Sequence, residues 1–221
     1  MRDKGITVLG AGSWGTALAI RLANNTNTPC LWGHETVFME MLSRERQNQQ
    51  FLPGFHFPEK LCIEARLDRA VQANRDLLIV VPSHAFREVL KSVAPLLNEK
   101  SRIAWATKGL EQSSGKFMSD VFEDVLGVKY PAAVVSGPTF AREVAADLPT
   151  ALTVASNNPV FANDMAARLH GGTMRAYTSD DMVGVQLGGT VKNVLAIGTG
   201  IADGMQFGAN SRAALITRGL A

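Results

Sequence analysis

Short apolar runs alternate with amphipathic segments along most of the chain. The apolar runs cover residues 6–9, 29–32, 76–82, 102–109, 132–138, 150–156 and 174–179. Between several of them, apolar residues recur at the spacing of one helix face, over residues 16–23, 83–99, 114–126 and 159–169. This alternation is typical of stacked βαβ units and predicts an α/β fold with a parallel sheet of about seven or eight strands. The Pro-Gly pair within residues 51–57 predicts a loop there.

The pattern changes to helices alone from residue 180, where we place a domain boundary. Residues 183–201 are long enough to cross a bilayer, but Gln186, Lys192 and Asn193 would lie near its centre, where a lysine costs about 3 kcal/mol or more. We therefore reject a membrane span and predict a buried helix whose glycines let another element approach closely. The sequence ends within a helix-like stretch, so we also expect this helix to present an apolar face. A partner chain, as in a homodimer, or further polypeptide would cover that face.

The first apolar run leads directly into a glycine-rich turn, "GAGSWG", at residues 10–15. Gly10 lets the chain leave the strand, Gly12 removes the Cβ that would block a pyrophosphate, and Gly15 lets the following helix approach the sheet. That helix begins near Ser13 and would direct its free N–H groups at the phosphate. Alone, the pattern can also be a tight turn. The strand before it and the helix after it favour a dinucleotide site in a Rossmann-type doubly wound sheet.

The composition argues against some classes of function. The 221 residues include 22 lysines and arginines against 20 acidic residues, a formal net charge of +2, and no basic run is interleaved with aromatic residues. Nothing therefore indicates nucleic-acid binding. Cys30 and Cys62 lack the spacing of metal ligands and lie in strand-like segments, so we expect no metal site. We interpret both as reduced, partly buried residues of a cytosolic protein.

Two lysines are candidates for chemistry. Lys108 comes directly after "RIAWAT", so the sheet would deliver its ammonium to the edge where parallel sheets bind ligands; the alternative is a solvated loop lysine. Lys192 lies among glycines and apolar residues in "GGTVKNVLAIG", and a buried ammonium needs a partner or a task. We favour Lys192 as the group that gives or takes the proton accompanying hydride transfer at a carbonyl. Pairing with Asp203, or reaching out to a helix end, is the alternative.

The end of the second strand bears on the choice of cofactor. A carboxylate about twenty residues after the glycines usually holds the ribose 2′-OH of NAD. This sequence has Trp32, Gly33 and His34 there, with Glu35 one position later. Because a histidine repels a 2′-phosphate less than a carboxylate does, we expect NADP to be accepted. The alternative is that His34 caps the next helix and Glu35 reaches the ribose.

Eight segments, taken together, match a known family. They are "GAGSWGTALA", "LWGHE", "FLPG", "VVPSHAF", "WATKGLE", "SGPTFAREVA", "GVQLGGTVKNVLAIGTGIADG" and "GANSRAALITRGL". They closely resemble the bacterial NAD(P)-dependent glycerol-3-phosphate dehydrogenases of the soluble biosynthetic type. The resemblance extends from residue 6 to the last residue. "WATKGLE" and "GGTVKNV" are specific to it, whereas the glycine motif alone is not.

The resemblance implies reversible reduction of dihydroxyacetone phosphate to sn-glycerol 3-phosphate, with NADP or NAD, for phospholipid synthesis in the cytoplasm. It implies a dinucleotide-binding domain at residues 1–179 and the start of an all-helical catalytic domain at 180–221. Lys192 would be the catalytic proton-transfer residue. By motif match, the cofactor contacts beside the three glycines would be Ser13, Trp14, His34, Lys108 and Ala141. The substrate contacts would be Lys108, Gly137, Thr139, Lys192 and Asn193.

Two other functions stay open. A related two-domain dehydrogenase acting on β-hydroxyacids shares the glycine-rich opening and a lysine on the first long helix of its second domain, although "WATKGLE" and "SGPTFA" argue against it. A non-catalytic module that senses dinucleotides belongs to a different class. Such a module would not need Lys192.

Overall fold

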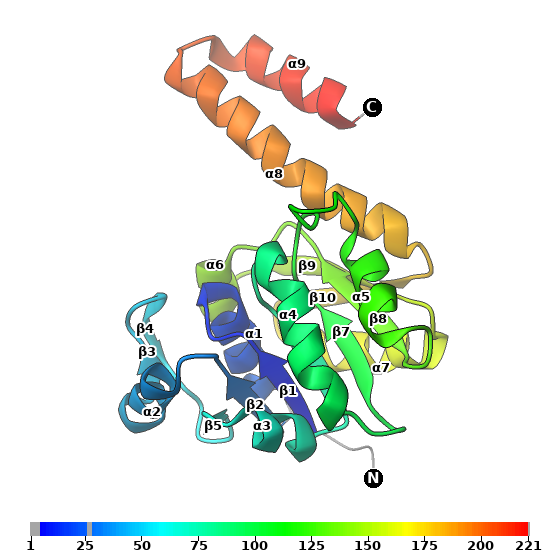
Figure 1. Cartoon of the computed structure of the whole chain (residues 1–221). Coiled ribbons are helices and arrows are strands. Elements are labelled where there is room, and N and C mark those ends of the chain that lie inside the picture. The colour runs from blue at the N-terminus through cyan, green and yellow to red at the C-terminus, as the bar shows by residue number, and fades with distance from the viewer. Residues whose placement is uncertain (1–4, 26–27, 221) are drawn as a thin grey trace.

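The computed structural model describes residues 5–25 and 28–220, leaving aside the side chains of Asn193 and Leu220. Figure 1 shows an α/β body built around one central sheet, with a pair of helices extending from it. Within the described residues the sheet has eight strands, in the order β10-β9-β8-β7-β6-β1-β2-β5. They are β1 (Gly5–Leu9), β2 (Thr28–Trp32), β5 (Cys62–Glu64), β6 (Asp76–Ile79), β7 (Arg102–Trp105), β8 (Ala132–Ser136), β9 (Thr150–Ser156) and β10 (Met174–Ser179).

The sheet is mixed rather than fully parallel. Within this sheet, as far as the structure describes it, every neighbouring pair of strands is parallel except β8 and β9. The predicted number of strands is confirmed, but the prediction of a parallel sheet is wrong for this pair. A parallel return needs a crossover that spans the sheet, and the β8–β9 connection holds only the helix α6 (Ala141–Ala145). Such a helix rises about 7.5 Å, less than half the ~17 Å of a five-residue strand, so β9 runs back antiparallel.

Helices cover both faces of the sheet, which confirms the doubly wound arrangement (Figure 1). One buried apolar cluster joins the sheet to α1 (Ser13–Asn24), α2 (Thr36–Glu45), α6 and α7 (Pro159–Leu169). The other joins it to α3 (Leu67–Ala73), α4 (Ser83–Val93) and α5 (Met118–Leu126). Because apolar side chains anchor β1, β2, β6, β7, β8 and β9 on both faces, the ends of these strands and the loops that follow them are held in fixed positions.

Two helices are shorter than the apolar spacing predicts. The helix predicted over residues 83–99 ends at Val93 and is followed by a single 3₁₀ turn, Ala94–Leu96. Pro95 explains this, because it has no N–H to continue the helix. The helix predicted from residue 114 begins at Met118, because residues 111–116 form a closed turn in which the Glu111 N–H donates to the Lys116 carbonyl.

The predicted loop at residues 51–57 is a small hairpin instead. β4 (Leu52–His56) pairs antiparallel with β3 (Gln47–Asn48), apart from the main sheet. Pro53 is tolerated because a two-stranded ribbon has only edge strands, and Gly54 adopts a left-handed φ of 88°. The Pro-Gly pair therefore lies in a strand, and the prediction of a loop is wrong.

The two cysteines lie on neighbouring strands but differ in exposure. Cys30 in β2 is buried, as predicted. Cys62 in β5 is exposed, which corrects the interpretation that both are partly buried. The reason is that β5 is the last strand at its edge of the sheet, with a neighbour on one side only.

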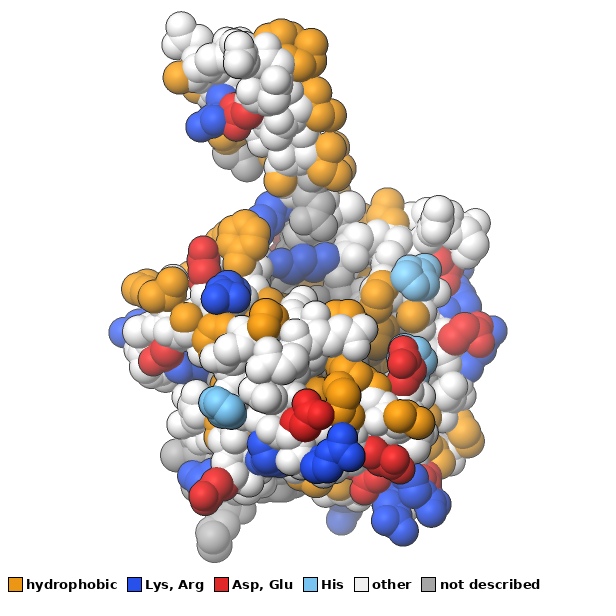
Figure 2. Space-filling model, turned by 90° about the vertical axis from the view of Figure 1, so that its left-hand side faces the viewer, with side chains coloured by type: hydrophobic (Ala, Val, Ile, Leu, Met, Phe, Trp, Pro, Cys, Tyr) orange, Lys and Arg blue, Asp and Glu red, His pale blue; other side chains and the backbone are white. Residues whose placement is uncertain are grey.

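A helical pair follows the sheet. α8 (Met182–Gly204) begins beside α5 and β8 and leads away from the body, and α9 (Gly208–Leu220) returns alongside it (Figure 1). Figure 2 shows hydrophobic side chains along this pair. On α8 the exposed large apolar residues are Val183, Leu187, Val194, Ile197 and Ile201. The expected apolar face is therefore present. The prediction that this helix is buried is wrong for the described residues. The boundary at residue 180 stays a prediction.

None of the helices in the described residues combines the length and the apolar character that crossing a bilayer requires.

Candidate active site

The candidate site lies where β1, β7 and β8 end. These strands run in the same direction, so the glycine turn after β1, Lys108 after β7 and Gly137 after β8 share one edge of the sheet. α8 passes over this edge. A Cβ placed on Gly189 would lie 2.6 Å from the Ser136 Oγ, so a larger residue here would require that hydroxyl to turn away.

The three glycines of the turn have different surroundings. Gly10 has a φ of 129°, and a Cβ on it would collide with the Val80 carbonyl. A Cβ on Gly15 would collide with the Gly10 carbonyl, so α1 packs directly on the turn. Gly12, in contrast, is the N-cap of α1, has no atom within 4 Å of its Cβ position, and offers no side chain to cap the helix. The first-turn N–H groups of α1 therefore face open space, which suits an anionic group.

These surroundings predict a contrast between two alanine variants. Gly15→Ala is expected to lower the free energy of unfolding by about 1–3 kcal/mol or more, because its Cβ meets backbone that cannot rotate away. Gly12→Ala should cost less than about 1 kcal/mol, since its Cβ enters open space at an N-cap. Urea denaturation of both variants beside the unmodified protein measures this. Equal losses would mean that the packing of α1 on the turn is not as tight as described.

Lys108 reaches back from the end of β7 toward the turn. Its Nζ lies 5.9 Å from the centre of the Trp14 ring and donates a 3.0 Å hydrogen bond to the Gly137 carbonyl. Burial, together with the positive charge of Lys192, lowers the pKa of Lys108 to about 8. The indole Nε1 of Trp14 is buried without a hydrogen-bond partner in the described residues.

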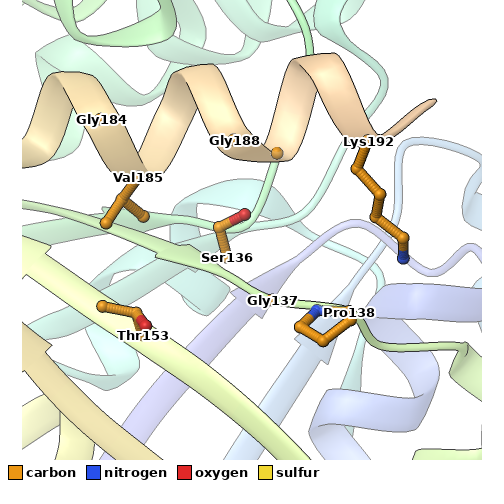
Figure 3. Close-up of a pocket in the computed structure, with 9 residues that line it drawn as sticks. Ser136, Gly137, Pro138, Thr153, Gly184, Val185, Gly188 and Lys192 are labelled. Atoms are coloured by element: carbon orange, nitrogen blue, oxygen red, sulfur yellow. The ribbon is translucent and has the colours of Figure 1, made fainter. Parts of the chain in front are cut away.

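Lys192 comes from α8 on the other side of the same edge. In Figure 3 its side chain extends from the helix toward the loop that holds Gly137 and Pro138. Its Nζ lies 4.8 Å from the centre of the Phe140 ring, within cation–π range. Between α8 and the ends of β8 and β9 lies an open cavity of about 300 Å³, lined by Ser136, Gly137, Pro138, Thr153, Gly184, Val185, Gly188, Gly189 and Lys192.

Two lysines place positive charge at this cavity, because Lys192 lines it and Lys108 is hydrogen-bonded to the carbonyl of Gly137, which also lines it. The contacts of the two lysine ammonium groups are aromatic rings and a backbone carbonyl, and within the described residues no carboxylate pairs with either. The alternative partner for Lys192, Asp203, is instead paired with Arg212. Two cations held close together without counter-charge favour binding of an anion such as a phosphate ester.

A partly buried ion pair holds the loop that carries Lys108. Glu111 accepts two hydrogen bonds from Arg87, at 2.7 and 2.9 Å, and one from the Ser114 hydroxyl at 2.6 Å. These hydrogen bonds, those of Arg87 first, lower the pKa of Glu111 to about 2. The carboxylate therefore stays charged and ties the loop to α4, which keeps the backbone that follows Lys108 in place.

The other predicted contacts are distributed around this edge. Ser13 is exposed at the start of α1, Thr139 is buried, and Ala141 is the first residue of α6. The side chain of Asn193 lies outside the described part of the chain. His34 follows β2 with 84% of its side chain exposed, 3.4 Å from the Glu35 carboxylate. Glu35 is the N-cap of α2, so the alternative in which His34 caps that helix is wrong.

Sequence reasoning missed two features of the site. Phe140, with 63% of its surface exposed, supports the Lys192 ammonium, and Gly189 lets α8 pass close to the Ser136 hydroxyl. The segment "SGPTFAREVA" contains both Ser136 and Phe140, and a phenylalanine in the loop that follows a strand could have been noticed. Nothing in the spacing pairs it with a lysine 52 positions later, because the contact depends on where α8 crosses.

Comparisons with known proteins agree with one another. Residues 5–162 match the family model described as NAD-dependent glycerol-3-phosphate dehydrogenase N-terminus, and residues 181–221 match the corresponding C-terminus. Glycerol-3-phosphate dehydrogenase (NAD(P)+) of Shewanella frigidimarina is 56% identical over 216 residues, which are 97% of this chain and 64% of the relative. The enzyme of that name from Pasteurella multocida is 57% identical over 217 residues, 98% of this chain and 64% of the relative.

A solved structure gives the same result in three dimensions. The crystal structure of glycerol-3-phosphate dehydrogenase from Coxiella burnetii has a TM-score of 0.93 and 50% sequence identity, covering 99% of this chain and 66% of that one. The chain thus spans about 64% of the length of the curated relatives it matches.

Proposed function

Because the chain belongs to the NAD-dependent glycerol-3-phosphate dehydrogenase family, we propose that the full-length protein reversibly reduces dihydroxyacetone phosphate to sn-glycerol 3-phosphate. The resemblance found in the eight sequence segments is thereby confirmed. The observation that carries the proposed activity is the convergence of Lys108 and Lys192, without carboxylate partners in the described residues, beside the glycine turn. Two cations and a helix N-terminus at one sheet edge suit a phosphorylated substrate next to a dinucleotide.

The cofactor we propose is NADP or NAD, which supplies or accepts the hydride when bound. The residues fit such a group. The open space at Gly12 and the uncapped N-terminus of α1 suit a pyrophosphate. The remaining cofactor contacts that we propose are Ser13, His34, Lys108 and Ala141.

Substrate binding rests on charge and size in this proposal. The cavity of about 300 Å³ is at the lower end of ligand sites and suits a small molecule. The ammonium groups of Lys108 and Lys192 would attract the phosphate ester, and the hydrogen bond to the Gly137 carbonyl holds the Lys108 ammonium beside a residue that lines the cavity. The further substrate contacts that we propose are Gly137, Thr139 and Asn193.

Lys192 is the proton-transfer residue in this proposal. As the carbonyl carbon of the substrate becomes an alcohol, the Lys192 ammonium gives a proton to the carbonyl oxygen, and in the reverse direction the neutral amine takes it back. The ring of Phe140 supports the ammonium on one side, which orients the Nζ. Lys108 lends positive charge to the oxygen as negative charge develops on it.

Steady-state kinetics of the full-length protein test the activity. With NADPH, we expect kcat/KM for dihydroxyacetone phosphate to exceed that for dihydroxyacetone by at least about tenfold, because charged hydrogen bonds to the phosphate are lost. Oxidation of a β-hydroxyacid in preference to sn-glycerol 3-phosphate would instead favour the related dehydrogenases. Binding of NADPH without turnover of either substrate class would favour the dinucleotide-sensing module.

The residue at position 34 is expected to influence the choice between cofactors. His34→Glu should lower kcat/KM with NADPH by about tenfold and leave that with NADH nearly unchanged, because a carboxylate repels the 2′-phosphate. His56→Glu, at an exposed position of β4 outside the site, is the matched control. The same fractional loss with both cofactors would show that His34 does not face the 2′-phosphate.

A cytoplasmic location, a role in phospholipid synthesis and a homodimer remain part of the proposal. The exposed apolar residues of α8 support an arrangement in which other protein covers this helix. Sedimentation equilibrium of the full-length protein tests the homodimer, and a monomer at all concentrations would contradict it.

A further inference from the structure

The two cysteines form a close pair at the edge of the sheet, outside the candidate active site. Cys30 in β2 and Cys62 in β5 are directly opposite each other in the parallel ladder, and their sulfur atoms are 3.4 Å apart. Neighbouring strands lie about 4.8 Å apart, within the ~4.4–6.8 Å range of Cα separations that a disulfide spans. The backbone therefore already has the spacing that a disulfide needs, and closing the bond requires rotation of the side chains.

The two thiols differ in access and in acidity. Cys30 is 3% exposed, whereas Cys62 is open to solvent. The hydrogen bond that the Cys30 thiol donates lowers the pKa of Cys62 to about 7, while the same contact and burial raise the pKa of Cys30. A solvent-exposed sulfur with thiolate character next to a second, protected thiol is the arrangement found at redox-sensitive sites.

We propose that Cys62 and Cys30 form a reversible oxidation site, in which a peroxide oxidises Cys62 and Cys30 then closes a disulfide. The Cys62 thiolate attacks one oxygen of the peroxide, the O–O bond breaks, and the leaving hydroxide takes up a proton to become water. Cys62 is then a sulfenic acid. The sulfur of Cys30 attacks the sulfur of Cys62, the S–S bond forms, and the hydroxyl group leaves as water with the Cys30 proton. Two thiols and one peroxide thus give one disulfide and two waters.

The position of the pair gives the oxidation a defined structural effect. β2 ends two residues after Cys30, at Trp32, whose carbonyl accepts a 2.7 Å hydrogen bond from the Gly10 N–H. β5 is a three-residue edge strand held to the sheet only through β2. A disulfide would tie this edge covalently to β2, the strand whose last carbonyl is hydrogen-bonded to the glycine turn, and thiol reductants would release it.

Oxidation of the full-length protein with hydrogen peroxide, followed by alkylation and peptide mapping, tests the proposal. In the unmodified protein we expect a cross-linked peptide that contains Cys30 and Cys62, has lost two hydrogens, and is restored by dithiothreitol. In Cys30→Ser, Cys62 should accumulate as a sulfenic acid that dimedone traps. In Cys62→Ser, Cys30 should stay reduced. Peptide mapping separates this pair from any other cysteine.

A measurement without substitutions guards against variants that fail to fold. At pH 7, iodoacetamide should alkylate Cys62 at least about tenfold faster than Cys30, and the rate for Cys62 should rise through a midpoint near pH 7. Oxidation of Cys62 to the sulfinic acid without a cross-link, oxidation of Cys30 in Cys62→Ser, or equal alkylation of both thiols would each overturn the proposal.

Discussion

Lys192→Ala in the full-length protein is expected to lower kcat for the reduction of dihydroxyacetone phosphate by about 10²–10⁴-fold. That range is the usual loss when a positioned acid is removed. The expectation follows from the site, because Lys192 extends from α8 toward the loop after β8 and its ammonium has no carboxylate partner in the described residues (Figure 3). The Phe140 ring, which holds the ammonium from one side, cannot take over proton transfer.

Two further variants separate charge from proton transfer. Lys192→Arg keeps the positive charge but cannot give up its proton, so KM for dihydroxyacetone phosphate should change little while kcat falls nearly as far as in Lys192→Ala. Lys91→Ala removes an exposed lysine that pairs with Glu88 on α4 and should leave both constants unchanged. If Lys192→Arg retained the kcat of the unmodified protein, the proton would come from elsewhere.

Lys108→Ala is expected to raise KM for dihydroxyacetone phosphate by about 10–100-fold and to lower kcat. KM should rise because a charged hydrogen bond to the phosphate is lost. kcat should fall because positive charge is removed from beside the reacting oxygen. Lys116→Ala is the matched control, because Lys116 belongs to the same loop but pairs with Asp124. Unchanged kinetics in Lys108→Ala would make it a solvated loop lysine.

The pKa of Lys108 adds a dependence on pH. Burial and the charge of Lys192 lower it to about 8, so the ammonium is charged below pH 8 and loses its proton above it. KM for the phosphate substrate should therefore rise as pH increases through about 8 in the unmodified protein. In Lys108→Ala that rise should be absent. A rise of the same size in the variant would assign the titration to another group.

The sequence pattern predicted the parts of the fold that depend on neighbouring residues. The strand, glycine turn and helix at residues 5–24 follow one another without insertion, so their arrangement is local. The direction of β9 was not predictable from its own apolar run. It depends on the length of the connection that precedes it, where α6 is too short to cross the sheet.

Buried charges were a second feature of the fold that the sequence pattern did not predict. Asp76 is fully buried, yet Arg102 and Arg168 donate hydrogen bonds to it at 2.6–2.8 Å, from positions 26 and 92 residues away. Burial alone would raise its pKa, but the hydrogen bonds and charges of the arginines, with Arg102 first, hold the pKa below its ordinary value. Each of these residues, taken alone, has the pattern of a solvated surface charge.

The site itself was predictable in part. Lys108 was found because it follows a strand, and Lys192 because a lysine among glycines and apolar residues is unusual. Their closeness was expected only through the family resemblance. It depends on the crossing of α8 at Gly189, which no spacing along the chain reveals. The apolar face of α8 was expected, but the prediction that the helix is buried was wrong, because an apolar helix indicates a face that other protein covers without showing which part of the protein covers it.

A single-turnover experiment tests the central claim, that this sheet edge is a dehydrogenase site with Lys192 as the proton donor. The full-length protein is saturated with NADPH, whose binding is measured by fluorescence, and mixed rapidly with saturating dihydroxyacetone phosphate. The unmodified protein should oxidise the bound NADPH in one fast phase. Lys192→Ala should bind NADPH equally well but oxidise it at least about 100-fold more slowly. Oxidation at the same rate in both proteins would contradict the account.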